Sequence, residues 1–158
     1  MRTSLVGRIR RQSGITLIEM LLVVAIVSLM AGLAFPAVSA GIDAVRLRSA
    51  CDGLAAFLNY GMTWCERRQE AVFLIVPGDR TVLRLRGLTP TPVREFVCPS
   101  GVKISAVLPE SDPGQDRIIP LMPGAPFPGL TFELVNQRGA RRLVRIDPME
   151  GVPQVLAP

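Results

Sequence analysis

The sequence contains no histidine, and its three cysteines form no CxxC pair. The absence of histidine removes the commonest general base and the commonest metal ligand of proteins. The GxSxG, Walker A and GxGxxG patterns of hydrolases and nucleotide-binding proteins are also missing. We therefore expect no enzyme activity, no catalytic residue, no cofactor and no metal site.

An excess of basic residues is lacking once the first 14 residues are set aside. Those residues hold four arginines and no acidic residue, and they account for most of the formal charge of +5. Residues 15–158 carry 14 basic and 13 acidic side chains. A broad phosphate-binding face is therefore not predicted, and we do not expect nucleic acid as a partner.

Charged residues are nearly absent from residues 15–38, a run of 24 residues whose only charge is Glu19. About 20 apolar residues in a helix cross the hydrocarbon core of a bilayer, so this run can span a membrane. Arginines before the run and none within it place the leader in the cytoplasm and the later residues outside. A carboxylate at the centre of a membrane helix costs about 3 kcal/mol, so Glu19 needs an explanation.

Composition leaves more than one interpretation of this run. The first is a plain membrane anchor. The second is a secretory signal peptide, because residues 36–40 (PAVSA) offer small side chains for a cut after Ala40. Against the second, the run exceeds the usual apolar region of a signal, about 7–15 residues, and the glutamate inside it is unexplained.

A third interpretation rests on the stretch SGITLIEM at residues 13–20. It resembles the cleavage site of type IV pilins and type II secretion pseudopilins. These proteins have a short basic leader, a glycine before the cut, a glutamate at the fifth position after it, and an apolar helix that is retained. Gly14 matches the glycine, Ile15 becomes the first residue where phenylalanine is usual, and Glu19 is the fifth. Pro36 matches a proline that is common in the family.

The resemblance implies that prepilin peptidase removes residues 1–14 and that Ile15 becomes N-methylated. It also implies that Glu19 faces the N-terminal amine of a neighbouring subunit in a filament, because a partner relieves the cost of an intramembrane charge. The alternative is that Glu19 reaches water at the membrane edge and has no role in assembly. Other pilin or pseudopilin subunits and an inner-membrane assembly platform are the implied partners.

Residues 39–69 predict an amphipathic continuation of the same helix. Apolar side chains recur three or four positions apart, at Leu47, Cys51, Leu54, Leu58, Met62 and Cys65. One helix is therefore expected from about Thr16 to about Gln69, with a bend or loosening at Pro36.

Cys98 is expected to behave differently from Cys51 and Cys65. Cys51 and Cys65 lie roughly 21 Å apart along a helix, too far for a disulfide, and each is expected to be a buried apolar side chain. Cys98 is able to bridge either of them in an oxidising periplasm, and the sequence does not choose between the two pairings.

Residues 70–158 predict a periplasmic, β-rich globular part. Short β-prone runs between turn signals predict strands at 71–76, 81–86, 93–97, 102–108, 130–135, 142–146 and 152–156. A helix followed only by strands predicts an α+β fold with an antiparallel sheet on the helix, and the resemblance makes this fold pilin-like. Residues 109–129 hold six prolines and are expected to form a surface loop, with a partner-docking site as the alternative.

Four arginines form a basic cluster in the predicted last hairpin: Arg138, Arg141, Arg142 and Arg145. We interpret them as a solvated face of the hairpin. The alternative is that Arg138, Arg141 and Arg142 contact phosphate, as in DNA-uptake pilins.

Within the pilin superfamily, the size and layout resemble the type II secretion pseudopilin H and FimT-like minor pilins. The segments WCERRQEAVFLIV (64–76) and GLTFELVNQRGARRLVRIDPMEGVPQV (129–155) carry this looser match. The implied function is a minor pseudopilin of a type II secretion system, anchored in the bacterial inner membrane and assembled into a short periplasmic pseudopilus that drives protein export. The alternative is a minor pilin of a type IV pilus, involved in pilus assembly or DNA uptake.

Overall fold

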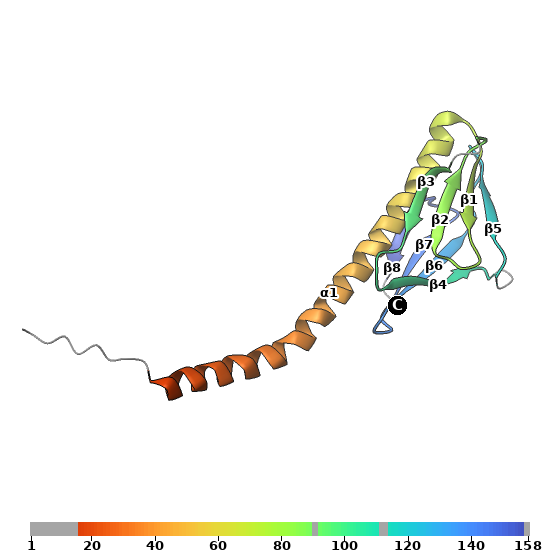
Figure 1. The fold of residues 1–158 in the computed structure, drawn as a ribbon. Helices are drawn as coiled ribbons and strands as arrows, with labels where there is room; N and C mark the ends of the chain where they lie inside the picture. The colour runs from red at the N-terminus through yellow and green to blue at the C-terminus, as the bar shows by residue number, and fades with distance from the viewer. Residues whose placement is uncertain (1–15, 90–91, 111–113, 157–158) are drawn as a thin grey trace, which may run out of the picture. The chain divides into compact units, whose positions relative to one another are not determined.

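A single long helix, α1 (Leu17–Arg68), opens the fold (Figure 1). The computed structural model describes residues 16–89, 92–110 and 114–156. The chain divides into two compact units, Met1–Ser39 and Ala40–Pro158, and α1 begins in the first and ends in the second. The observed bounds of α1 differ from the predicted ones by one residue at each end.

The second half of α1 supplies one wall of the core. All six residues of the predicted apolar stripe are buried, and Cys51, Leu54 and Cys65 have no exposed surface. Phe57 and Ala50 lie beside the stripe and are buried as well. Each fully buried leucine or phenylalanine stabilises the fold by about 1.5–3 kcal/mol, so this face holds α1 on the β-rich part.

Eight strands follow α1 in the described residues, and their pairing is antiparallel throughout. They are β1 (Val72–Val76), β2 (Val82–Arg86), β3 (Pro92–Val97), β4 (Val102–Leu108), β5 (Arg117–Leu121), β6 (Leu130–Asn136), β7 (Arg141–Ile146) and β8 (Pro153–Leu156). This arrangement confirms the α+β, pilin-like layout expected from the sequence. The strands form two sheets rather than one, in the orders β3-β2-β1-β5 and β4-β6-β7-β8.

Strand β5 differs from the sequence prediction, which placed a loop over the whole of residues 109–129. Residues 117–121 pair with β1, with Ile119 opposite Leu74 and Pro120 opposite Phe73. Ile119 and Leu121 are buried in the core, which explains why this proline-containing segment is extended. A proline is tolerated because β5 is an edge strand of its sheet, where one side of the backbone has no partner strand.

The two sheets and the second half of α1 share one hydrophobic core. Strand β6 alternates buried and half-buried residues along its length, and Leu130, Phe132 and Leu134 point into this core. On the helix, Gly61 allows the closest approach to the other sheet. A Cβ atom at Gly61 would lie 2.8 and 2.9 Å from the two Cδ atoms of Leu85 in β2.

Candidate assembly segment and basic surfaces

The first turn of α1 is capped by Thr16. The backbone N–H of Glu19 donates to the carbonyl oxygen of Thr16 at 3.0 Å and lies 3.4 Å from its Oγ1. A threonine in this position satisfies N–H groups that have no partner within the helix. The sequence analysis missed this role, although Thr16 and Glu19 have the T-x-x-E spacing of a capping box.

Glu19 lies in the first turn of α1 with an exposed side chain. A negative charge is favoured at this end of a helix because the helix dipole places partial positive charge there. Among the described residues, no side chain or backbone group forms an ion pair or hydrogen bond with its carboxylate. Gly14 and Ile15, the residues of the predicted cut, lie outside the described residues.

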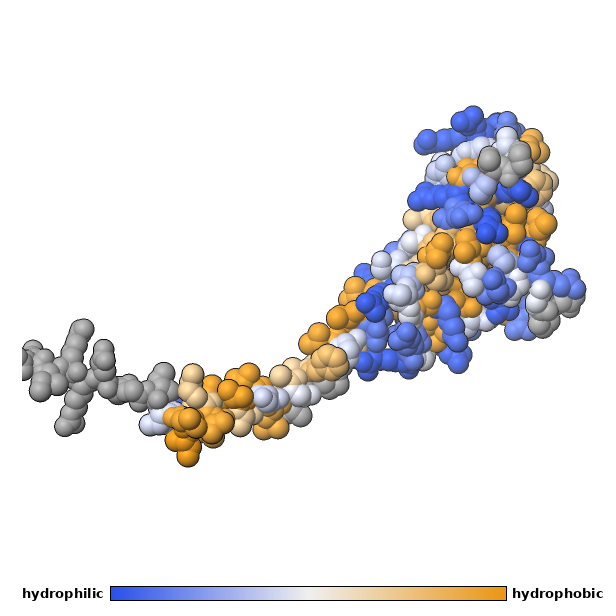
Figure 2. Space-filling view, in the orientation of Figure 1, coloured by the Kyte–Doolittle hydropathy of each residue, from blue (hydrophilic) through white to orange (hydrophobic). Residues whose placement is uncertain are grey.

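Over residues 17–38, the apolar side chains that the structure describes are exposed on every side of α1. Leu17 and Ile18 are more than 70% exposed, and apolar residues continue through Val38 (Figure 2). Helix α1 contains a window with a mean hydropathy of 2.5 that is long and apolar enough to cross a membrane. An apolar surface of this extent marks a membrane-facing or partner-facing segment.

Pro36 lies inside α1, and a proline has no backbone N–H to donate to a helical hydrogen bond. A bend of α1 at Pro36 would set the orientation of one unit relative to the other, and it stays a prediction.

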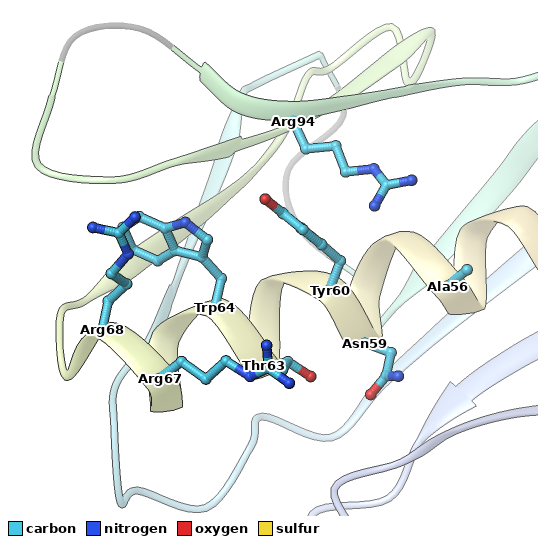
Figure 3. A pocket seen from close by; sticks show the side chains of 8 residues that line it. All are labelled: Ala56, Asn59, Tyr60, Thr63, Trp64, Arg67, Arg68 and Arg94. Carbon is cyan, nitrogen blue, oxygen red and sulfur yellow. The ribbon is translucent and has the colours of Figure 1, made fainter.

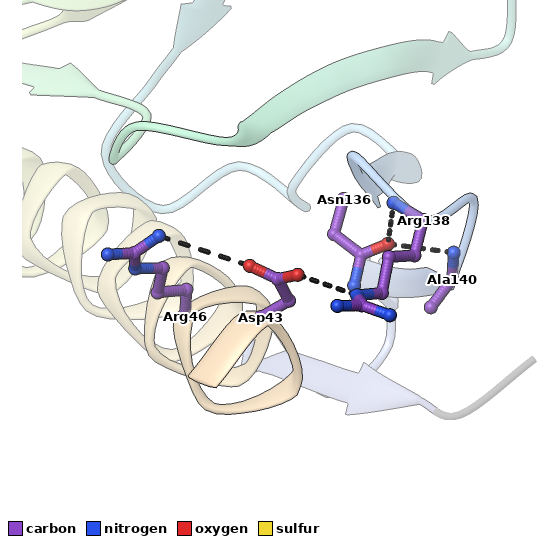
Figure 4. A network of polar contacts seen from close by, with 5 residues as sticks. All are labelled: Asp43, Arg46, Asn136, Arg138 and Ala140. Atoms are coloured by element: carbon purple, nitrogen blue, oxygen red, sulfur yellow. Dashed lines mark hydrogen bonds and ion pairs between the residues drawn. The ribbon is translucent and has the colours of Figure 1, made fainter. Parts of the chain in front are cut away.

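The β6–β7 hairpin is organised by Asn136, the one buried polar side chain among the described residues. Its Oδ1 accepts hydrogen bonds from the backbone N–H groups of Arg138 at 3.0 Å and Ala140 at 2.9 Å (Figure 4). This turn directs Arg138 towards α1, where its Nε lies 2.8 Å from Oδ2 of Asp43. Arg46 lies 3.9 Å from the other carboxylate oxygen of Asp43.

The other arginines of the hairpin are also close to carboxylates of the same chain. Arg141 pairs with Glu133 at 3.0 Å, and Arg145 lies 3.7 Å from Asp147. Arg142 has no such partner within the described part of the chain. Much of the hairpin's positive charge is therefore offset locally, and a phosphate contact through Arg138, Arg141 and Arg142 stays a hypothesis.

The three cysteines are free thiols in the structure. The Cys65 thiol donates a hydrogen bond to the carbonyl oxygen of Leu121 at 3.2 Å. Burial raises the pKa of the Cys51 thiol from 9.0 to about 11. Arg142 lowers this pKa and Asp52 raises it, each by less than burial does. Burial also raises the pKa of the Cys98 thiol. Raised pKa values disfavour the reactive thiolate, so none of these side chains resembles an activated nucleophile.

Two comparisons relate parts of the chain to known proteins. Residues 9–35 match the family described as "Prokaryotic N-terminal methylation motif", which confirms the type IV pilin-like resemblance carried by Gly14, Ile15 and Glu19. The chain is also similar to the "Type II secretion system protein H" of Xanthomonas campestris pv. campestris, with 50% identity over 56 residues.

That second match covers 35% of this chain, and the chain spans about a third, 33%, of the length of the curated relative. It supports the predicted resemblance to pseudopilin H for the matched part. No solved structure gives a significant match to the chain.

Proposed function

We propose that the protein is a minor pseudopilin of a type II secretion system. Prepilin peptidase cleaves after Gly14, Ile15 becomes the methylated N-terminus, and α1 inserts in the inner membrane with the β-rich part in the periplasm. The subunit then joins a short filament whose growth drives export of proteins. Its role is mechanical and not enzymatic.

The observation that carries this proposal is the unpartnered Glu19 at the start of an apolar helix, inside a matched methylation motif. In a simple anchor, the helix dipole returns at most about 1 kcal/mol for this carboxylate, whereas the charge makes insertion less favourable by about 3 kcal/mol. A subunit in a filament gains an ion pair with the amine of Ile15 in its neighbour. The carboxylate therefore favours the assembled subunit over the isolated one.

The test replaces Glu19 by alanine in the full-length chain and follows three steps in cells. Glu19→Ala should still insert and still be cleaved, because its helix is more apolar and Gly14 is intact. Its yield of crosslinks to other filament subunits should fall by about tenfold or more, since removal of one partner leaves the other charge without its counter-ion. The crosslink yield of Glu19→Asp should lie between those of the wild type and Glu19→Ala, because the shorter side chain keeps the charge but does not reach as far.

Thr16→Ala is the matched control. It removes the cap that the structure shows beside Glu19 but keeps the carboxylate, so crosslinking and secretion should stay near the wild-type level. If processed Glu19→Ala is crosslinked and supports secretion like the wild type, Glu19 is only an edge residue and the proposal fails. A loss in Thr16→Ala equal to that in Glu19→Ala would assign the effect to capping instead.

A further inference from the structure

A groove of about 540 Å³ lies between the last turns of α1 and strand β3 (Figure 3). Its floor and walls include two aromatic residues, Tyr60 and Trp64, and three arginines, Arg67, Arg68 and Arg94. We call it the α1–β3 groove. All of its lining residues belong to the unit Ala40–Pro158.

The arginines of the α1–β3 groove differ from Arg138, Arg141 and Arg145 of the β6–β7 hairpin, each of which lies close to a carboxylate. In the described residues, no acidic side chain lies within ion-pair distance of Arg67, Arg68 or Arg94. The two acids next to them in sequence are engaged elsewhere. Glu66 accepts a hydrogen bond from the backbone N–H of Gly124, and Glu95 pairs with Arg84.

Two of the guanidinium groups are held in place by aromatic rings. Arg94 lies over the ring of Tyr60 at 4.7 Å, and Arg68 lies over the ring of Trp64 at 5.8 Å. Such stacking orients the planar guanidinium group while its N–H donors remain available at the edge. The groove therefore presents oriented donors for an anionic ligand, and less side-chain freedom is lost when the ligand binds.

The chemistry of the groove favours carboxylates over nucleic-acid bases. Arg68 and Arg94 each cover one face of an aromatic ring, which leaves less ring surface on which bases could stack. Carboxylates bind at the edges of guanidinium groups, in paired hydrogen bonds, without displacing them from the rings. The near balance of charge over residues 15–158 also gives no extended basic field of the kind that nucleic acids need.

The dimensions indicate a short segment. Tyr60 and Arg68 are eight residues apart in α1, about 12 Å along the helix axis. An extended peptide of about four residues covers that length. We propose that the α1–β3 groove is a docking site for an acidic peptide segment of another protein, whose carboxylates pair with Arg67, Arg68 and Arg94. This inference goes beyond the proposed function and does not depend on the role of Glu19.

Trp64 makes the proposal directly measurable, because it is the only tryptophan in the chain. The full chain in a neutral detergent is titrated with the peptide Ac-EELEE-NH2, which has no aromatic residue. We expect a saturable change in Trp64 emission that weakens as NaCl rises from about 50 to about 300 mM. The uncharged peptide Ac-QQLQQ-NH2 should give no saturable change.

Variants locate the binding. Arg67→Gln with Arg94→Gln should weaken binding of the acidic peptide by about tenfold or more, since two charge-assisted pairs are lost. The matched control is Arg141→Gln with Arg145→Gln, which removes the same charge from the hairpin and should bind like the wild type. Thermal melting checks that each variant is folded. The single variant Arg94→Gln, at an exposed position of β3, replaces the double variant if that does not fold.

Several results would overturn the proposal. One is the absence of a saturable change with the acidic peptide. Another is equal weakening in the groove and hairpin variants, which would indicate attraction to net charge alone. A third is a groove variant that melts earlier but binds like the wild type, because the arginines would then only support the end of α1. Tighter binding of oligothymidylate than of the peptide, lost in the groove variant, would assign the groove to nucleic acid.

Discussion

At the residue scale, Cys51 shows how burial alone changes the chemistry of a side chain. Its thiol has no exposed surface on the apolar face of α1, and burial is the main reason that its pKa rises to about 11. The folded protein therefore holds this proton more tightly than the unfolded chain does. Stability conferred by the neutral thiol is fully present below a pH of about 9 and is lost as the pH rises towards about 11.

This effect predicts a pH-dependent difference between the wild type and Cys51→Ala. At a pH of about 8 the wild type should be the more stable, because the variant leaves a small cavity. The difference should shrink by about 2 kcal/mol by a pH of about 11 and by about 3 kcal/mol above that pH, the equivalent of a two-unit rise in pKa. Urea unfolding of both proteins across this range measures it. A difference that is constant with pH would show that Cys51 does not titrate in this way.

Thiol accessibility gives a second expectation at the same scale. Cys98 is half-buried, whereas Cys51 and Cys65 are completely buried. Alkylation by iodoacetamide under native conditions should therefore modify Cys98 first, and the other two should react only as the protein opens. Mass spectrometry of partly alkylated protein gives the order. Early modification of Cys65 would contradict the packing of this thiol against the backbone of Leu121.

At the element scale, the contact between α1 and β2 depends on Gly61. Replacing Gly61 by valine should destabilise the protein by about 1–3 kcal/mol, because the fully buried Leu85 has little room to move. Gly41→Val is the control with the same change in helix propensity. Apart from its chain neighbours and the adjacent turns of the helix backbone, no heavy atom of the described residues lies within 4 Å of a Cβ atom at Gly41, so the effect of Gly41→Val should be small. Equal changes of thermal stability in the two variants would indicate that the contact with Leu85 does not determine the effect.

The elements themselves were largely predictable, and their partners were not. The second half of α1 followed from its apolar residues at three- and four-residue spacing, and the strands other than β5 followed from β-prone runs between turn signals. Strand β5 was missed because Pro120 argues against a strand unless the sheet edge is known. The division into two sheets depends on pairings between distant segments, such as β1 with β5 and β4 with β6, and no local pattern encodes them.

The same distinction applies to the candidate sites. Gly14, Ile15 and Glu19 were found from a contiguous motif. The α1–β3 groove was not found, because Arg94 comes from a strand that only folding brings to Tyr60 and Trp64. The neutralising partners of the hairpin arginines were missed for a similar reason, since Asp43 is 95 residues away from Arg138.

At the scale of the whole molecule, the proposed function predicts where the mature chain begins. The intact mass of the membrane-bound form should correspond to a chain that starts at Ile15, with an added methyl group. Gly14→Ala should slow or block the cut, whereas Ser13→Ala should change it little. A chain that starts at Gly41 would identify an ordinary signal peptide, and neither α1 in the membrane nor a filament role would survive that result.

Pro120 has a consequence for how such a molecule can associate with others. An open strand edge is a template on which further chains can add strands, and this route leads to amyloid-like aggregates. Strand β5 is such an edge, and it contains Pro120, which has no backbone N–H. Prolines are accepted in edge strands at positions where the missing donor faces away from the partner strand. An incoming strand would therefore meet a gap in its hydrogen-bond ladder. The proline in this edge strand therefore disfavours association of the protein through added strands.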